Sequence, residues 1–522
     1  MLEKVDLSKA MTKEEYKEKM PQLQVRLGEL QRECKELKIP VMVVFEGFGA
    51  SGKGLQIGEL IQSLDPRGFN VFAIKNETEE ERMHPFLWRF WTKTPEKGRI
   101  AIYDGSWYRR VLIDRFENRT KAKDLASAYH SICSFEKQLT DDGYVMIKML
   151  LDIDQKEQKK RFQKLKENKE TAWRVSSGDM ERNKRFPEYV SMIEEMLQIT
   201  DTDYAPWSII EAMDRRYATA KIYTVVIRAL EAALEKKKKA LARPKEEETD
   251  VPASGLQESV LNQADLSLAL TREEYKEKLK ELQKKITLLH GELYRRRIPV
   301  VLGFEGWDAG GKGGAIKRLT QKMDPRGFVV NPTAAPNDIE KAHHYLWRFW
   351  NAMPKAGHIA IFDRTWYGRV MVERIEGFCS RQEWQRAYKE MNDMEKDLSD
   401  SGAIVMKFWM QIDKDEQERR FKERQENPEK QWKITDEDWR NREKWDLYED
   451  AVNEMLIRTS TEYAPWIVVE GNDKLYARIK VLETVVDAIE KRIAEENKEE
   501  KKKEEKKEAK EKHRKSNNKK KK

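Results

Sequence analysis

A glycine-rich stretch occurs twice in the chain, as FEGFGASGKG at residues 45–54 and as FEGWDAGGKG at residues 304–313. An apolar run precedes each stretch, and in each a glycine is separated by four residues from a Gly-Lys pair. The backbone N–H groups of such a loop, and of the helix after it, cradle phosphate oxygens while the lysine adds a positive charge. The pattern therefore predicts phosphate-binding loops at residues 47–53 and 306–312.

The loop of the second copy supplies the phosphate contacts that we expect. The residues concerned are Gly306, Gly310, Gly311, Lys312 and Gly313. In the usual pattern a Ser or Thr follows the lysine and binds Mg²⁺ through its hydroxyl, but Gly313 stands there. Another oxygen ligand is therefore needed if this loop works with a metal ion.

Two carboxylates can replace that hydroxyl. Asp308 lies inside the loop, and Asp363 ends the apolar run HIAIFD, where P-loop enzymes place a metal-holding acid. Because Mg²⁺ (or Mn²⁺) prefers hard oxygen ligands, we expect Asp308 and Asp363 to hold it. A turn contact within the loop is the alternative role for Asp308.

Positive charges accompany these groups. Arg364 directly follows the second acid, and Lys317, Arg318 and Lys322 follow the loop at helical spacing. Arg318 and Lys322 are four residues apart and share one helix face. Cations that lead away from the loop suit a polyanion longer than a triphosphate, and a solvated helix face is the alternative interpretation.

The chain is a tandem duplication. LDPRGF at residue 64, LWRFW at 87 and YAPW at 204 recur, with one substitution, 259 positions later. A repeat this long is a duplicated domain rather than a solenoid unit. We expect an N-terminal domain at residues 6–236, a linker at 237–264, a C-terminal domain at 265–495 and a charged, disordered tail at 496–522.

The first copy has lost charged residues that the second copy keeps. It retains Lys53 and Asp104, but the positions of Asp308, Arg364, Lys317, Arg318 and Lys322 are taken by Gly49, Gly105, Gly58, Glu59 and Ser63. An acid, an arginine and three further cations are therefore missing around a preserved glycine loop. We interpret the N-terminal copy as a degenerate domain that keeps the fold without the chemistry.

The elements that must position these residues follow an α/β pattern. In each copy short apolar runs such as IPVVLGFEG, GHIAIFD and WIVVEG alternate with long amphipathic helical segments. This alternation predicts a parallel sheet with helices on both faces. Hydrophobic residues make up 39% and charged residues 37% of the 522 residues, and the net charge is +8.

Composition also bounds the location and the partners. The chain contains no apolar run of about 18 residues and no apolar signal core at its N-terminus. Its three cysteines lie far apart, which indicates neither a disulfide framework nor a zinc site. We expect a cytoplasmic protein without membrane or nucleic-acid partners. Assembly into a homo-oligomer is compatible with the sequence.

With GWDAGGKGG, DPRGF, YLWRFW, FDRTWYGRV and YAPW in this order, the second copy resembles the polyphosphate kinase 2 family. Two fused copies resemble its two-domain members, of the polyphosphate:AMP phosphotransferase type. The resemblance implies a thymidylate-kinase-like P-loop core with a helical lid, and Mg²⁺-dependent phosphoryl transfer from inorganic polyphosphate to AMP. It implies catalytic roles for Asp308, Lys312, Asp363 and Arg364, with Arg364 on the phosphate of the acceptor.

Three alternatives remain open from the residues. They are a polyphosphate-dependent ADP or GDP kinase, an ATP-using nucleotide kinase, and a non-catalytic polyphosphate-binding protein. The lid is expected at residues 419–452, where Arg419, Arg420, Lys433 or Arg442 could contact substrate. The other interpretation of this segment is an amphipathic helical hairpin whose tryptophans, Trp432, Trp439 and Trp445, belong to the core.

Overall fold

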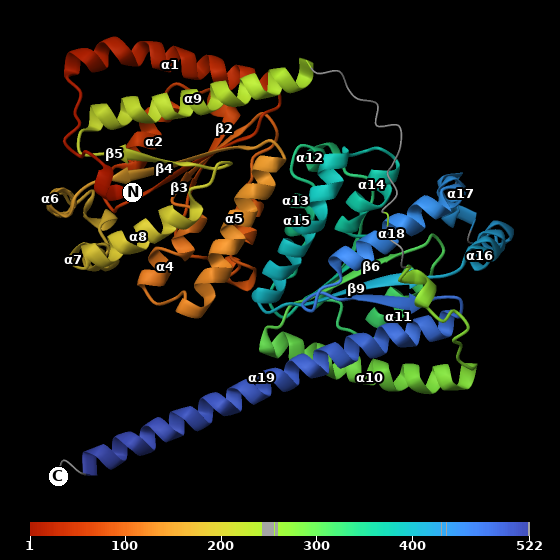
Figure 1. Ribbon diagram of the computed structural model, residues 1–522. Helices are drawn as coiled ribbons and strands as arrows, with labels where there is room; N and C mark the ends of the chain where they lie inside the picture. The colour runs from red at the N-terminus through yellow and green to blue at the C-terminus, as the bar shows by residue number, and fades with distance from the viewer. Residues whose placement is uncertain (243–254, 256–258, 430, 435, 520–522) are drawn as a thin grey trace. The chain divides into compact units, whose positions relative to one another are not determined.

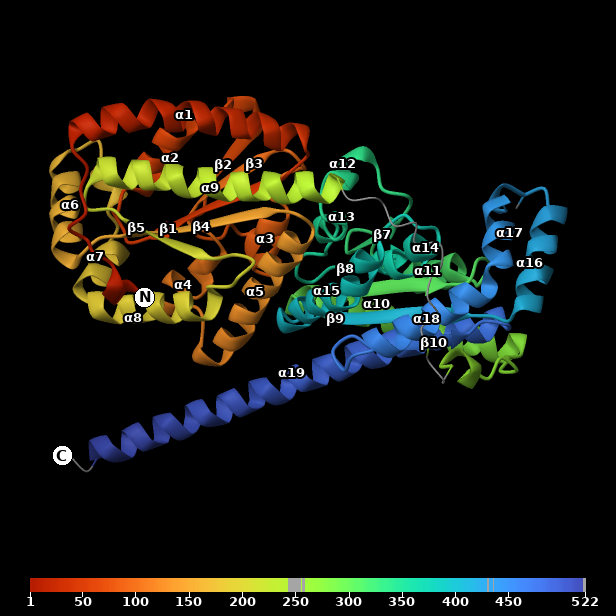
Figure 2. The ribbon, with the colours of Figure 1, turned by 45° about the horizontal axis from the view of Figure 1, so that its top comes forward.

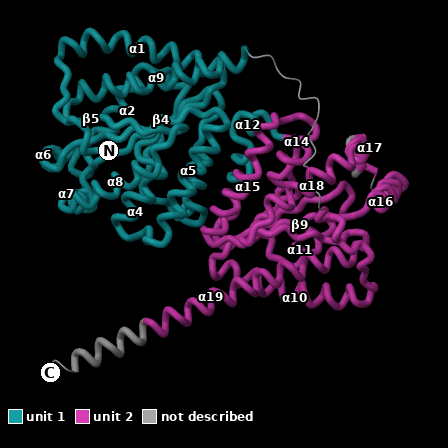
Figure 3. Tube along the Cα trace, viewed as in Figure 1, with its two compact units in different colours: residues 1–249, 336–351 teal, residues 250–335, 352–522 magenta. Residues whose placement is uncertain are grey.

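The computed structural model describes residues 1–242, 255, 259–429, 431–434 and 436–519 (Figure 1). The chain forms two compact units (Figure 3): one contains residues 1–249 and 336–351, and the other contains residues 250–335 and 352–522. Much of the linker expected at residues 237–264 lies outside the described residues. The domain limits inferred from the repeat therefore stay predictions.

Each unit contains one parallel five-stranded sheet. In the second unit the strand order is β10-β9-β6-β8-β7, and in the first it is β2-β3-β1-β4-β5. When one of the two orders is read in reverse, they correspond strand for strand. The strands are β1 Val41–Gly47, β2 Phe69–Ala73, β3 Ile100–Asp104, β4 Val145–Asp152, β5 Trp207–Glu211, β6 Val300–Gly306, β7 Phe328–Pro332, β8 Ile359–Asp363, β9 Ile404–Gln411 and β10 Trp466–Glu470. The predicted α/β fold with two tandem parallel-sheet domains is confirmed.

Helices cover both faces of the second sheet. On one face α10, α11 and α19 pack together, and Ile316 and Val485 join Phe304 of β6 in the buried core. On the other face α15 packs against β9 and α18. The helices of this unit are α10 Arg272–Arg296, α11 Lys312–Thr320, α14 Val372–Ile375, α15 Arg381–Asp400, α16 Lys414–Glu426, α17 Asp436–Glu443, α18 Trp445–Thr459 and α19 Lys474–Lys519.

The first unit repeats this arrangement, and α1 and α9 lie side by side over its sheet (Figures 1 and 2). Its helices are α1 Lys13–Glu36, α2 Lys53–Ile61, α3 Trp88–Trp91, α4 Ile113–Phe116, α5 Leu125–Asp141, α6 Gln155–Glu167, α7 Ser177–Lys184, α8 Phe186–Thr200 and α9 Arg215–Ala242. The short helices α12 Asp338–Lys341 and α13 Trp347–Asn351 of the second repeat also group with this unit. There Trp350 stacks on Trp91 at 5.7 Å, and the Lys97 N–H donates to the Ala342 carbonyl.

Each unit contains a buried network of charged and polar groups beside its sheet. Lys407 on β9 donates to Glu395 Oε2 at 2.6 Å, to the Tyr367 hydroxyl at 2.9 Å and to the Thr459 carbonyl at 2.7 Å. Lys148 makes the equivalent three contacts in the first copy. Buried charges need such partners, since an unpaired one is strongly destabilising. The first copy keeps this network although it has lost several charged residues around its loop. The role of the network is therefore structural.

The disorder expected for the C-terminal segment stays a prediction, although most of that segment is described as part of a helix. Helix α19 continues through residues 496–519, and Lys503 pairs with Glu499 one turn earlier at 3.8 Å. Lys, Glu and Ala have high helix propensity, and such pairs stabilise a helix by themselves. Across the residues that the structure describes, no helix is both long and apolar enough to cross a membrane.

Candidate active site

The glycine loop of the second copy joins β6 to α11. Strand β6 ends at Gly306 and α11 begins at Lys312, so the helix N-terminus faces the loop. Gly306 has φ +146°, and a Cβ there would come within 2.6 Å of the Met410 carbonyl oxygen. The close approach of β9 therefore excludes any side chain at this position. Lys312 Nζ donates to the Gly306 carbonyl at 2.8 Å, which holds its ammonium group over the loop.

The two predicted acids lie at the same edge of the sheet. Asp363 ends β8, and the strand register pairs it with Phe304 of β6, just before the loop. Arg364 follows with φ +66° and donates its backbone N–H to the Phe304 carbonyl. Its Nη2 lies 3.4 Å from Asp308 Oδ1, and the Asp308 side chain is 18% exposed. The fold thus brings Asp308, Asp363 and Arg364 to the mouth of the loop.

Glu305 fixes the segment that carries Arg364. This buried carboxylate accepts the Thr365 backbone N–H at 2.6 Å and the Thr365 hydroxyl at 2.8 Å. Burial raises the pKa of Glu305, and the positive charge of Lys312 acts in the opposite direction. Sequence reasoning missed Glu305 because Glu46 of the first copy makes the same contact with Ser106, so comparing the copies gave no signal.

The acids at this edge fit a magnesium site completed by substrate. Asp308 and Asp363 offer hard oxygens, and no group of three metal-ligating side chains occurs among the described residues. Magnesium is commonly bound by one or two carboxylates together with substrate phosphates and water. The residues present therefore suit Mg²⁺ beside a phosphate chain better than an all-protein metal cage.

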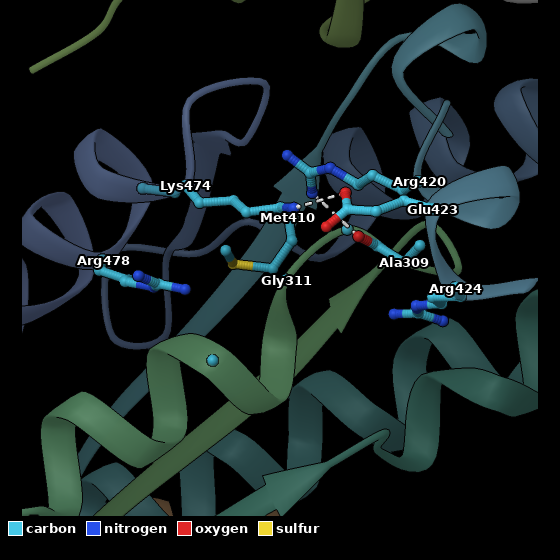
Figure 4. Close-up of a pocket in the computed structure, with 11 residues that line it drawn as sticks. Ala309, Gly311, Met410, Arg420, Glu423, Arg424, Lys474 and Arg478 are labelled. Atoms are coloured by element: carbon cyan, nitrogen blue, oxygen red, sulfur yellow. Dashed lines mark hydrogen bonds and ion pairs between the residues drawn. The ribbon is translucent and has the colours of Figure 1, made fainter. Parts of the chain in front are cut away.

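A cationic cavity opens beside the loop (Figure 4). It encloses about 190 Å³ between the loop, helix α16 and the first turns of α19. Its cationic lining consists of Arg420, Arg424, Lys474 and Arg478. Figure 4 shows Lys474 and Arg478 on one side of the loop and Arg420 and Arg424 on the other. A polyanion that enters here meets positive charge from both helices.

Arg420 and Lys474 also have contacts within the protein. Arg420 clamps the loop, because its Nη1 donates to the Ala309 carbonyl at 2.9 Å and its Nη2 to the Gly471 carbonyl at 2.5 Å. Arg161 makes the corresponding contacts in the first copy, which identifies this clamp as part of the frame. Lys474 lies 3.5 Å from Glu423.

The first copy keeps only part of this cationic lining. Leu165 and Thr219 occupy the positions of Arg424 and Arg478. Arg215, at the position of Lys474, forms an ion pair with Glu59, at the position of Arg318. The sequence comparison detected the exchange at Glu59 but missed the other three, because they lie on helices far from the loop in sequence. The tertiary structure thus extends the divergence of the copies to a second surface.

The predicted basic helix is only partly associated with the cavity. Arg318 is half-buried and lies one helical turn beyond Gly314, against which Arg478 packs. Lys317 is exposed on α11, and Lys322 lies beyond the end of that helix. None of these three cations lines the cavity itself. The choice between polyanion contact and a solvated face therefore stays open for Lys317, Arg318 and Lys322.

The expected lid is a helical hairpin of α16 and α17, which stand side by side in Figures 1 and 2. Arg419 is exposed and pairs with Glu416, while Arg442 donates to the Lys414 carbonyl on α16. The side chain of Lys433 lies outside the described residues. The interpretation of the tryptophans as core is wrong for Trp432, which is 75% exposed because it lies at the hairpin tip.

The other two tryptophans are packed. Trp439 lies edge-on to Phe421 at 5.1 Å, which joins α17 to α16. Trp445 is buried and stacks on Trp307 of the loop at 3.6 Å. Hairpin and loop are therefore coupled through aromatic contact.

A further difference between the copies lies in the segment that follows Arg364 in sequence. In the first copy Arg109 contacts Asn76 and lies 3.4 Å from Asp114. The second copy has Gly368 and Ala335 at the positions of Arg109 and Asn76. The guanidinium of Arg109 therefore has no counterpart at this position in the second copy.

Together, the parallel sheet, the glycine loop before a helix, the acid at the end of the adjacent strand and the helical hairpin define a protein of the P-loop kinase class. The family model for polyphosphate kinase 2 matches residues 10–239 and 269–499. The chain therefore belongs to the polyphosphate kinase 2 family, as the sequence motifs predict.

The chain is also similar to proteins that it matches over nearly their whole length. It is 41% identical to a polyphosphate:AMP phosphotransferase of Pseudomonas aeruginosa, over 94% of this chain and 99% of that protein. It is 39% identical to a polyphosphate:AMP phosphotransferase of Pseudomonas syringae pv. tomato, over 95% of this chain and all of the relative. A crystal structure from Pseudomonas aeruginosa, described as polyphosphate kinase 2, superposes with a TM-score of 0.83 at 39% identity, covering 95% of this chain and 100% of that one.

Proposed function

We propose that this protein transfers a phosphoryl group from inorganic polyphosphate to AMP, giving ADP, and that the second copy carries the activity. The observation that supports this most is the cationic cavity beside the second loop, because Arg424 and Arg478 are replaced by Leu165 and Thr219 in the first copy. The full-length relatives named polyphosphate:AMP phosphotransferase support the same substrates.

In this proposal the polyphosphate end lies on the loop and the rest of the chain follows the cavity. The helix N-terminus and Lys312 stabilise the phosphoryl group as it transfers, and Arg364 orients the AMP phosphate. Asp308 and Asp363 hold Mg²⁺ (or Mn²⁺), which supplies charge neutralisation at the phosphate oxygens.

The bond changes are simple. The bond between the terminal phosphorus and its bridging oxygen breaks, a bond to an oxygen of the AMP phosphate forms, and the shortened polyphosphate leaves as an anion. The attacking oxygen of AMP is already ionised, so little base chemistry is needed. Catalysis then consists mainly of positioning and charge stabilisation, as is general for phosphoryl transfer. Gly368 and Ala335 stand where the first copy holds Arg109 and Asn76, and in this proposal the acceptor lies near these two small residues.

The rival functions differ on the donor or the acceptor side. Against an ATP-using kinase stand Gly313, where a hydroxyl is usual, and a cavity that extends beyond the loop. A polyphosphate-dependent ADP or GDP kinase shares the donor side and differs only in its acceptor. A non-catalytic polyphosphate-binding protein would not need the acids of the second copy.

One assay separates these functions. Purified protein is incubated with Mg²⁺ and AMP plus polyphosphate, AMP plus ATP, or ADP plus polyphosphate, and nucleotides are quantified by chromatography. We expect ADP from AMP and polyphosphate at the highest rate, and no turnover with Asp308→Asn. A higher rate with ATP as donor, or with ADP as acceptor, would replace this proposal by the corresponding rival. Absence of turnover in all mixtures would favour the binding protein.

A further inference from the structure

Asn441 connects the helical hairpin to the loop acid. It lies on α17, and its Nδ2 donates to Asp308 Oδ2 at 3.1 Å. The other carboxylate oxygen, Oδ1, faces Arg364 Nη2 at 3.4 Å. Gln417 on α16 donates to the Asp308 backbone carbonyl at 3.2 Å. The carboxylate is therefore oriented by two different donors, one on each oxygen.

The position of Asn441 is fixed by its neighbours on the hairpin. The adjacent Arg442 donates to the Lys414 carbonyl at 2.6 Å and to Glu418 Oε2 at 2.7 Å, both on α16. Four residues after Asn441, Trp445 stacks on Trp307 of the loop. The contacts of Arg442 and Trp445 therefore hold the helix that carries Asn441, so that its amide lies beside Asp308.

The first copy replaces this contact with a different one. Arg182 stands at the position of Asn441, and Gly49 at that of Asp308. Arg182 donates to Asp179 Oδ1 at 2.6 Å and to Glu117 Oε1 at 3.1 Å. A Cβ added at Gly49 would lie 3.1 Å from Asp179 Oδ1. The ion pairs of Arg182 thus replace, in the first copy, the contact that Asn441 and Asp308 make in the second.

Not every contact between hairpin and loop has changed. Gln158 donates to the Gly49 carbonyl at 3.1 Å, as Gln417 does to Asp308. The glutamine contact is common to both copies and belongs to the frame. The asparagine and the aspartate, in contrast, are present together in one copy and absent together from the other, which links Asn441 to the acid rather than to the fold.

The chemistry of the amide suits a carboxylate that must keep its charge. A hydrogen bond from a neutral amide orients the carboxylate, whereas a guanidinium at this position would form a strong ion pair and compete with a metal ion. We propose that Asn441 is a positioning residue that holds Asp308 in the orientation required for binding the divalent cation. This inference rests on the proposed function, in which Asp308 holds that cation.

The test compares Asn441→Ala with wild type and with a matched control in the first copy, Arg182→Ala. Partners that orient metal ligands typically contribute about 10–100-fold in metal affinity or activity. For Asn441→Ala we expect kcat to fall about tenfold and the half-saturating Mg²⁺ concentration to rise, with the KM for AMP within about twofold. Arg182→Ala should leave all three quantities unchanged.

A second readout does not need turnover. Binding of Mn²⁺ to the protein with polyphosphate is measured by electron paramagnetic resonance. Asn441→Ala should weaken it in the wild-type background and should change nothing in the Asp308→Ala background, because the amide acts through that carboxylate. If Asn441→Ala melts more than about 4 °C lower, Asn441→Ser carries the same test.

Three outcomes would overturn the inference: unchanged Mn²⁺ affinity in the Asn441 variant, unchanged Mg²⁺ dependence, or a further loss of Mn²⁺ affinity when the Asn441 change is added to Asp308→Ala. A wild-type protein without polyphosphate-dependent transfer would instead refute the proposed function. In that case the Mn²⁺ measurement still decides whether Asn441 and Asp308 are coupled.

Discussion

Replacing Arg364 by glycine should separate activity from stability. Arg364 adopts φ +66°, and its first-copy counterpart Gly105 has φ +72°. A left-handed backbone costs a non-glycine residue about 1–2 kcal/mol. Glycine relieves this strain but adds about 0.5–1 kcal/mol of unfolded-state entropy. The lost ion pair with Asp308 contributes at most about 1 kcal/mol, since the Arg364 side chain is 58% exposed.

These terms nearly cancel, so Arg364→Gly should unfold within about 1 kcal/mol of wild type. In a unit of this size that corresponds to a Tm shift of roughly 2–4 °C in either direction. Activity should fall about 10²–10³-fold, the usual effect of removing one preorganised donor from a developing charge. Arg364→Lys keeps the charge but loses the planar fork, and we expect it to restore only part of the rate.

The reverse substitution provides the matched control. A Cβ at Gly105 would meet its neighbours at 3.7 Å or more, so Gly105→Arg introduces backbone strain without a clash. It should lower stability by about 1 kcal/mol and leave turnover unchanged. The measurements are differential scanning fluorimetry and ADP formation from AMP and polyphosphate. Retention of more than about a tenth of the rate by Arg364→Gly, or a Tm drop beyond about 4 °C, would refute the reasoning.

Three other predictions follow from the comparison of the two copies. Lys312→Ala should abolish turnover, whereas Lys53→Ala should change kcat by less than about threefold, under 1 kcal/mol; equal losses would make the first copy a working site. Deleting residues 1–236 should nevertheless reduce solubility and Tm, because Trp350 would lose its stacking partner Trp91 and become exposed; a soluble, fully active deletion variant would contradict this. The double change Arg424→Leu and Arg478→Thr, which installs the residues of the first copy, should raise the KM for long polyphosphate more than that for triphosphate and weaken its salt dependence; equal effects on both chain lengths would exclude these arginines from the path of the donor.

The sequence predicted those features of this protein that depend on local pattern. Apolar runs alternating with amphipathic segments predicted the parallel sheets, because strand and helix periodicities are local properties. The loop at residues 306–312 and Asp363 at a strand end could be placed for the same reason. The first copy then acted as an internal reference, since Gly49 and Gly105 showed which charges the fold does not need.

Sequence reasoning was weaker where function depends on side chains that meet across the fold. It examined the helix directly after the loop and missed Arg424 and Arg478, which reach the loop from α16 and α19. It included Arg420 among possible substrate contacts. The guanidinium of Arg420 donates to a loop carbonyl, and Arg161 makes the same contact in the first copy. Which arginine faces a ligand and which braces the backbone depends on helix packing, which local pattern does not encode.

By itself, then, the sequence determined the fold class, the duplication, the family and the positions of the loop lysine and the two acids. The tertiary structure decided that Arg364 is held in a left-handed conformation beside Asp308, that Asn441 reaches that carboxylate across 133 positions of sequence, and that residues 336–351 group with the first unit. The physical reason is the same in each case. Backbone preference and periodicity act over a few residues, whereas hydrogen bonds between distant side chains exist only once sheet register and helix packing have brought their atoms within about 3 Å.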